Sequence, residues 1–156
     1  MTKVTFMFPG QGSLEEGMGR EIAEAVPAAM EVFRAGSKAA GIDLVKLCFD
    51  TPLAQMVDTE VQQPALVVTS LAINEAILER GIKPDYVIGH SVGEFAALAA
   101  ARSLSAAEAV ALVRERGLPL ERGERASQSL VRVRPATSGC SRRTSSRSCR
   151  SSSVNR

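Results

Sequence analysis

The sequence is poor in aromatic residues, histidine and cysteine. Its 156 residues contain no tryptophan, one tyrosine and a single histidine, His90. The three cysteines, Cys48, Cys140 and Cys149, are an odd number at wide spacing, and no Cys-x-x-Cys or Cys/His cluster accompanies them. Neither a disulfide framework nor a zinc site is therefore indicated. We expect free thiols and no bound metal.

Long hydrophobic runs are also missing. The apolar run from Val4 to Phe8 is too short for a membrane span, and no charged leader of a signal peptide precedes it. Hydrophobic residues nevertheless make up 45% of the chain, which is enough for the core of one globular domain. The composition therefore predicts a cytoplasmic protein with no membrane partner.

Charge is distributed unevenly along the chain. Residues 1–121 contain 10 basic and 16 acidic residues, whereas residues 122–156 contain nine arginines, one glutamate and ten serines. The second segment has almost no periodic apolar positions, so it cannot bury enough surface to offset the entropy of ordering the chain. We predict a folded unit over 1–121 and a disordered tail over 122–156.

The favoured origin of this tail is a shifted reading frame in a GC-rich gene. A basic arm that binds nucleic acid is the alternative interpretation of the arginines. No aromatic residue is interleaved with them for base stacking, so we expect no nucleic-acid partner.

The first 121 residues alternate between strand-like and helix-like patterns. Apolar runs predict strands over residues 4–8 and 86–88. Helical spacing predicts helices over about 17–40, with a break near Pro27, over about 60–80 and over 94–101. Capping signals predict three further helix starts, at Asp43, at Thr51-Pro52 and at a capping box from Ser105 to Glu108. Strands separated by helices predict an α/β fold with a parallel sheet.

The segment Gly89-His90-Ser91-Val92-Gly93 has two interpretations. A Gly-x-Ser-x-Gly pattern between a strand and a helix is typical of a sharp turn that exposes a nucleophilic serine. Ser91 with Glu94 three residues later is also an ordinary helix capping box. In the first interpretation the N–H of Val92, at the helix N-terminus, is placed to stabilise an oxyanion.

A second glycine-rich segment, Phe8-Pro9-Gly10-Gln11-Gly12-Ser13, directly follows the first strand. Two glycines allow the backbone to approach a ligand closely, so the N–H of Gln11 is a candidate for a second oxyanion donor. A simple glycine-rich turn is the alternative.

Four segments together resemble the malonyl-CoA:acyl-carrier-protein transacylases of fatty-acid synthesis, and share most of their features with the acyltransferase domains of polyketide synthases. In chain order they are Phe8–Ser13 with Gly17-Met18, then Gln63-Pro64-Ala65-Leu66, then Gly89–Glu94, then Arg116-Gly117. The resemblance covers about residues 1–117. It implies part of an α/β-hydrolase-like parallel sheet with flanking helices.

The resemblance also implies a site. Ser91 would accept the malonyl group from the coenzyme A thioester and pass it to the phosphopantetheine thiol of acyl carrier protein. The backbone amides of Gln11 and Val92 would form the oxyanion hole, Arg116 would grip the free carboxylate of malonate, and Gln63 would lie near the acyl pocket. Coenzyme A enters as part of the substrate, and no cofactor is implied. Without the resemblance, Arg116 would be interpreted as a solvated residue of the last helix.

His90 is adjacent to Ser91 but is a poor candidate for the general base, because neighbouring residues at a strand end point to opposite sides. It is assigned instead to the substrate-binding residues. The family's histidine base lies in its later half, together with a ferredoxin-like subdomain, and this sequence has no later histidine. We therefore expect a truncated chain that is weakly active or inactive, with exposed apolar surface where the sheet is incomplete.

Two alternative functions remain open from the sequence. One is a serine hydrolase that passes the acyl group from a thioester to water. The other is a fragment without catalytic activity that binds a carrier protein.

Overall fold

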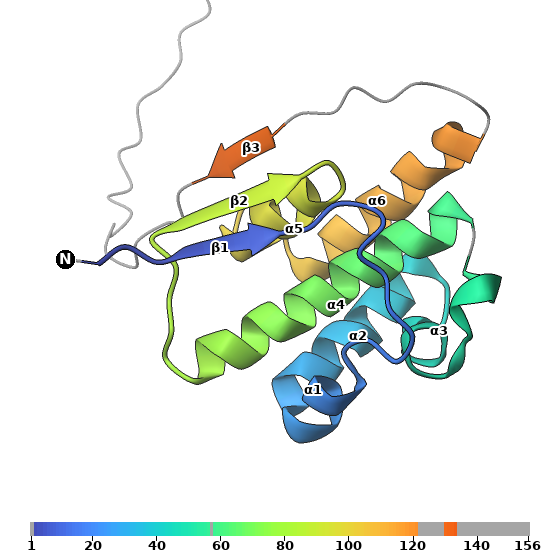
Figure 1. Ribbon diagram of the computed structural model, residues 1–156, viewed down its shortest axis with the longest axis horizontal. Helices are drawn as coiled ribbons and strands as arrows, with labels where there is room; N and C mark the ends of the chain where they lie inside the picture. The colour runs from blue at the N-terminus through green and yellow to red at the C-terminus, as the bar shows by residue number, and fades with distance from the viewer. Residues whose placement is uncertain (1, 57, 122–129, 134–156) are drawn as a thin grey trace, which may run out of the picture.

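The computed structural model describes residues 2–56, 58–121 and 130–133. Figure 1 shows a small sheet with a layer of helices against it. In chain order the elements are β1 (Thr5–Phe8), α1 (Arg20–Ala25), α2 (Pro27–Ala40), α3 (Leu44–Asp50), the 3₁₀ turn η1 (Leu53–Gln55), α4 (Thr59–Glu79), β2 (Tyr86–His90), α5 (Gly93–Ala100), α6 (Ala106–Glu121) and β3 (Leu130–Val133).

The sheet has the order β1-β2-β3. β1 and β2 are parallel, as predicted, and Phe8 is paired with Gly89, so the loops that follow the two strands begin side by side. β3 is antiparallel to β2. Leu130–Val133 lie in the segment predicted to be disordered, and they form a strand instead. The remaining residues of 122–156 lie outside the described residues.

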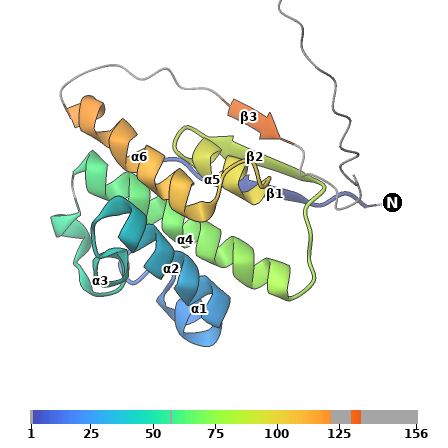
Figure 2. The same ribbon diagram turned by 180° about the vertical axis from the view of Figure 1, so that it is seen from behind.

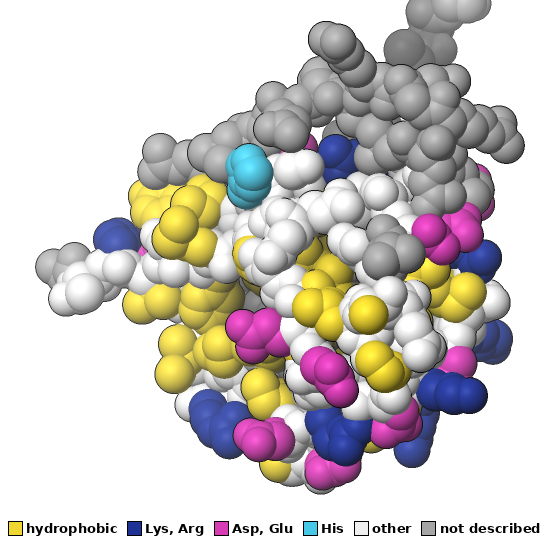
Figure 3. All heavy atoms as spheres, turned by 45° about the vertical axis from the view of Figure 1, so that its right-hand side comes forward, with side chains coloured by type: hydrophobic (Ala, Val, Ile, Leu, Met, Phe, Trp, Pro, Cys, Tyr) yellow, Lys and Arg dark blue, Asp and Glu magenta, His cyan; other side chains and the backbone are white. Residues whose placement is uncertain are grey.

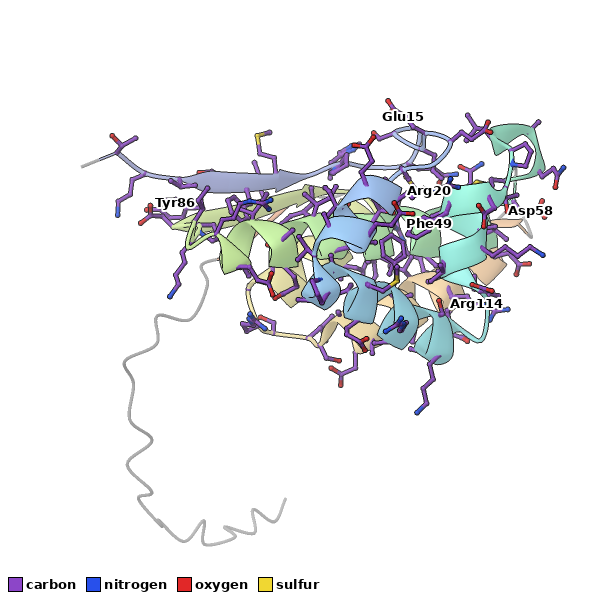
Figure 4. The ribbon with its side chains drawn as sticks, turned by 90° about the horizontal axis from the view of Figure 1, so that it is seen from below. Glu15, Arg20, Phe49, Asp58, Tyr86 and Arg114 are labelled. Carbon is purple, nitrogen blue, oxygen red and sulfur yellow. The ribbon has the colours of Figure 1, made fainter. Side chains whose placement is uncertain are left out.

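The described helices lie on one side of the sheet, as seen from below in Figure 4 and from behind in Figure 2. Buried and exposed side chains alternate along the strands because only one face of the sheet is covered by helices. Phe8 and Val87 point into the helical layer and are buried. Met7 points the other way and is 75% exposed. Met7 is therefore an exposed apolar side chain on this face of the sheet, and the wider apolar surface expected from the sequence stays a prediction.

Helix α4 is the centre of the fold. It is buried around most of its circumference because it lies between the sheet, α2, α5 and α6. Phe33 of α2 and Phe49 of α3 close one end of the core. Their rings pack edge to face, with 5.0 Å between the ring centroids. Figure 4 shows Arg20 of α1 beside Phe49 of α3. Arg20 Nη2 also forms an ion pair with Asp50 Oδ1 at 2.7 Å, so this arginine joins α1 to α3.

Cys48 lies in this core as a free thiol, as predicted. Burial removes its sulfur from water and raises the pKa of the thiol to about 12, against a smaller opposing effect of the hydrogen bond from Thr69. The thiol is therefore protonated at neutral pH. Cys140 and Cys149 lie outside the described residues.

Most of the predicted helix ends are confirmed. The break falls at Pro27, which is the first residue of α2. Asp43 caps α3 by accepting the N–H of Lys46 at 3.0 Å. The capping box is formed in both directions, since Ser105 N–H donates to Glu108 at 2.8 Å and Glu108 N–H donates to the Ser105 hydroxyl at 3.1 Å.

The predicted cap at Thr51-Pro52 is wrong. Only the short turn η1 follows it, with Pro52 at its start and no side-chain cap. The Thr51 hydroxyl donates backward to the carbonyl of Lys46 at 3.2 Å and so closes the end of α3 instead.

Candidate active site

Ser91 lies in the turn between β2 and α5. Its φ of 52° is in the left-handed region of the backbone, which residues other than glycine rarely adopt. Such a conformation costs about 1–2 kcal/mol, so it persists only where its surroundings enforce it. Gly89 shows why: a Cβ at this position would lie 2.2 Å from the carbonyl oxygen of Gly93. The strand and the helix thus approach closely enough to force the intervening residue into a sharp turn.

The capping-box interpretation of Ser91 is wrong. Val92, not Ser91, precedes the first residue of α5, and no side chain caps this helix. The serine hydroxyl instead accepts a hydrogen bond from another part of the chain.

That donor is Arg116 on α6. Its Nη2 lies 3.3 Å from Ser91 Oγ, although the two residues are 25 positions apart. Its guanidinium carbon also lies 5.7 Å from the centre of the Phe95 ring. The other terminal nitrogen, Nη1, is buried and has no acceptor among the residues that the structure describes. A buried cationic donor without an acceptor is suited to bind an anion.

A second close approach brings α6 to this position. A Cβ on Gly117 would lie 2.7 Å from the Cα of Glu60, so glycine allows α6 to pack directly on the first turn of α4. Arg116 immediately precedes this contact. Its orientation toward Ser91 therefore depends on the packing of two helices that are distant in sequence.

The loop with Gln11 meets the serine turn at the same edge of the sheet. A Cβ on Gly93 would lie 2.4 Å from the carbonyl oxygen of Phe8 and 2.5 Å from that of Pro9. A Cβ on Gly10 would lie 2.5 Å from Nδ1 of His90. These glycines allow the two loops to contact each other through their backbones.

Gly93→Ala tests this contact. Alanine would force its methyl group into two carbonyl oxygens, and we expect a loss of about 3 kcal/mol in the free energy of unfolding, measured with urea. Gly81→Ala is the control, because its Cβ would have no atom within 4 Å, and its positive φ should cost only about 1 kcal/mol. A neutral or stabilising Gly93→Ala, as expected for a glycine in an unconstrained helix, would contradict the packing.

Two backbone donors are available at the junction. Neither the N–H of Gln11 nor the N–H of Val92 donates to an acceptor within the described part of the chain. Val92 stands at the N-terminus of α5, where the helix dipole favours negative charge. Because the two loops are in contact, both amides remain the predicted candidates for binding an oxyanion.

His90 is exposed, and its ring lies against Gly10. Figure 3 shows this histidine at the surface of the molecule. Among the described residues, Arg116 is the one side chain that hydrogen-bonds the Ser91 hydroxyl, and it is a donor. The described site therefore contains a nucleophile candidate and an anion-binding group, but no general base next to the serine.

Gln63 is 2% exposed, and its Nε2 donates to Oε1 of Gln11 at 3.3 Å. Nε2 of Gln11 in turn donates to Oε1 of Gln62 at 3.2 Å. The structure thus adds Gln62 and Phe95 to the neighbourhood of the predicted residues. The place of Phe95 beside Arg116 depends on the packing of α5 against α6, which no local pattern predicts. Nothing in the sequence distinguishes Gln62 from other polar residues of α4.

Within the described residues, no helix is long and apolar enough to cross a membrane. The same residues contain no group of three or more histidine, cysteine, aspartate and glutamate side chains placed to hold a metal ion.

Comparison with known protein families identifies the family to which the chain belongs. Residues 5–141 match the acyl transferase domain family, so the match extends past the predicted boundary at residue 121. The chain belongs to this family. The malonyl CoA-acyl carrier protein transacylase of Bacillus subtilis strain 168 is 45% identical over 117 residues, which are 75% of this acyl transferase chain and 37% of the relative.

Solved structures of the acyl transferase family show the same fold. The malonyl CoA-acyl carrier protein transacylase of Clostridium perfringens is 38% identical and superposes with a TM-score of 0.71, over 75% of this chain and 37% of its own. A malonyl-transacylase in complex with a type II polyketide-synthase acyl carrier protein is 34% identical, with a TM-score of 0.74 over 80% and 40% of the two chains. The chain therefore spans about 37–40% of the length of these relatives.

Proposed function

We propose that the chain carries the nucleophile half of a malonyltransferase site, which moves a malonyl group from coenzyme A to the phosphopantetheine thiol of acyl carrier protein. The observation that carries this proposal is the 3.3 Å contact between Arg116 Nη2 and Ser91 Oγ, together with the buried Nη1 that has no acceptor among the described residues. This contact supports the proposal because a guanidinium so close to the serine could pair with the carboxylate of a malonyl group bound there.

In the first step, Ser91 Oγ attacks the thioester carbonyl carbon, and the hydroxyl proton leaves to solvent. The carbonyl oxygen becomes an oxyanion, for which the N–H groups of Gln11 and Val92 are the proposed donors. The carbon–sulfur bond then breaks, and coenzyme A departs as its thiolate, which takes up a proton. The product is a malonyl ester of Ser91.

In the second step, the carrier-protein thiolate attacks this ester, and the alkoxide of Ser91 leaves and is protonated. Throughout both steps, the guanidinium of Arg116 is proposed to pair with the free carboxylate of malonate. Because no base lies next to Ser91 within the described residues, we expect acylation to be slower by several orders of magnitude than with a complete triad. His90 is proposed to contact the substrate, since its ring lies over Gly10 beside the site.

The proposal extends to the fold. The sequence order of strand, sharp turn and helix at Ser91, with its φ of 52°, supports an α/β-hydrolase-like sheet of which these strands are one part. The names of the relatives support the substrate and the partner, because they are malonyl CoA-acyl carrier protein transacylases and one was solved with an acyl carrier protein.

Transfer to a carrier protein tests the function. The chain is incubated with labelled malonyl-CoA and with acyl carrier protein that carries its phosphopantetheine arm, and we expect label on the carrier protein above the rate without the chain. Carrier protein without the arm has no thiol and should gain no label. Release of malonate with no labelled carrier protein would instead indicate the thioester hydrolase, and binding of the carrier protein without any turnover would indicate the non-catalytic fragment.

A further inference from the structure

The Gln11 side chain is held from two sides by consecutive residues near the start of α4. Its amide oxygen accepts from Gln63 Nε2 at 3.3 Å, and its amide nitrogen donates to Gln62 Oε1 at 3.2 Å. Both ends of one amide are therefore used in a directed chain from Gln63 through Gln11 to Gln62. The chain connects the loop after β1 to the N-terminal part of α4, 51 and 52 residues away.

Packing alone holds this loop poorly beyond Gly10. Gln11 and Gly12 are exposed, and a Cβ on Gly12 would have no atom within 4 Å. Gly12 also has φ 102°, a conformation that glycine reaches without strain but does not enforce. Gly10 is fixed against His90, but the next two residues depend on other interactions for their position.

We infer that Gln62 is a positioning residue for the candidate active site, acting through the side chain of Gln11. By accepting the Gln11 amide, it holds the backbone N–H of Gln11 beside the serine turn. The consequence for the reaction rests on the proposed function of that N–H as an oxyanion donor, since a donor that must first be ordered stabilises the transition state less well. Gln63 anchors the other end of the same amide, but it is buried, so Gln62 is the better position to vary.

The direction of the hydrogen bonds gives a specific prediction. Gln62 acts as an acceptor, and a carboxylate is an acceptor of similar shape, so Gln62→Glu should preserve the contact with Gln11. The carboxylate would also lie near the N-terminus of α4, where the helix dipole favours negative charge. Gln62→Ala removes the acceptor. Gln55→Ala on the exposed turn η1 is the control.

The first measurement is the backbone order parameter of the Gln11 and Gly12 amides by NMR relaxation. We expect values near 0.85 in the wild type, Gln62→Glu and Gln55→Ala, and values below about 0.6 in Gln62→Ala with an unchanged melting temperature. A structural effect without positioning would lower the melting temperature and leave the two amides as rigid as the rest of the loop. Unchanged order parameters in Gln62→Ala, or equal loss in Gln62→Glu, would overturn the inference.

The second measurement is the single-turnover rate of malonyl-adduct formation in the same four proteins. We expect Gln62→Ala to be about 3- to 10-fold slower, the range of one ordinary hydrogen bond, and Gln62→Glu to recover the wild-type rate. If the wild type forms no adduct, the proposed function fails, and the order parameters alone decide whether Gln62 positions the loop.

Discussion

Ser91→Ala is expected to abolish the malonyl adduct. Alanine can adopt the same turn but has no hydroxyl to attack the thioester, and removal of a serine nucleophile from enzymes of this kind costs about 10⁴-fold or more in rate. Intact-mass measurement after incubation with malonyl-CoA should show a gain of one malonyl group in the wild type and none in the variant.

The control for this experiment is Ser13→Ala. Ser13 is an exposed serine in the loop after β1, close to the site in the fold but without the strained turn of Ser91. It should acquire the adduct as the wild type does. Ser91→Ala should also unfold at the wild-type temperature, because it removes only the contact with Arg116. An adduct of equal extent in Ser91→Ala would show that another residue reacts.

Arg116→Ala is expected to slow acylation by malonyl-CoA about 100-fold and to leave acylation by acetyl-CoA nearly unchanged. The physical reason is that only malonate carries a carboxylate, and loss of one partner from a desolvated, hydrogen-bonded charge pair costs about 2–5 kcal/mol. Single-turnover rates with the two thioesters measure this discrimination directly.

Two further variants separate charge from geometry. Arg116→Lys retains the positive charge but not the planar fork, so it should recover only part of the malonyl preference. Arg114→Ala, on the same helix, is the matched control, because the Arg114 guanidinium lies near Gly41 rather than Ser91, and Figure 4 shows where this side chain lies. Equal loss with malonyl- and acetyl-CoA in Arg116→Ala would exclude a carboxylate-binding role.

The serine turn was one of two structures that the sequence predicted for this segment, and its determinants are local. Gly89 and Gly93 stand next to Ser91, between an apolar run and a helical run, and the structure shows that both glycines make backbone contacts that a methyl group would prevent. The choice between a turn and a capping box was not settled by the letters alone. It depends on the partner of the Glu94 N–H, which donates to the backbone carbonyl of Ser91 at 3.1 Å and not to the Ser91 hydroxyl.

The approach of Arg116 to Ser91 could not be derived from spacing. It requires α6 to pack on α4 at Gly117 and Glu60, a contact between residues more than 50 positions apart in the sequence. Only the family resemblance pointed to this arginine. The chain of hydrogen bonds from Gln11 to Gln62 has the same character, since it joins a loop and a helix through side chains whose partners are distant in sequence.

At strand β3 the sequence predicted disorder where the structure has a strand. Leu130–Val133 are surrounded by arginine and serine, so their composition predicts disorder, yet four residues are enough to pair with β2. The edge of an existing strand supplies hydrogen-bonding groups that composition does not reveal. Tertiary context has overridden the local signal here.

Localisation of the malonyl adduct tests the central claim most directly. After incubation with malonyl-CoA, the chain is digested with a protease and each peptide is weighed by mass spectrometry. We expect the malonyl group on the peptide with Ser91, and fragmentation should place it on that residue. A malonyl group confined to Cys48 or to a lysine, with the Ser91 peptide unmodified, would contradict the account.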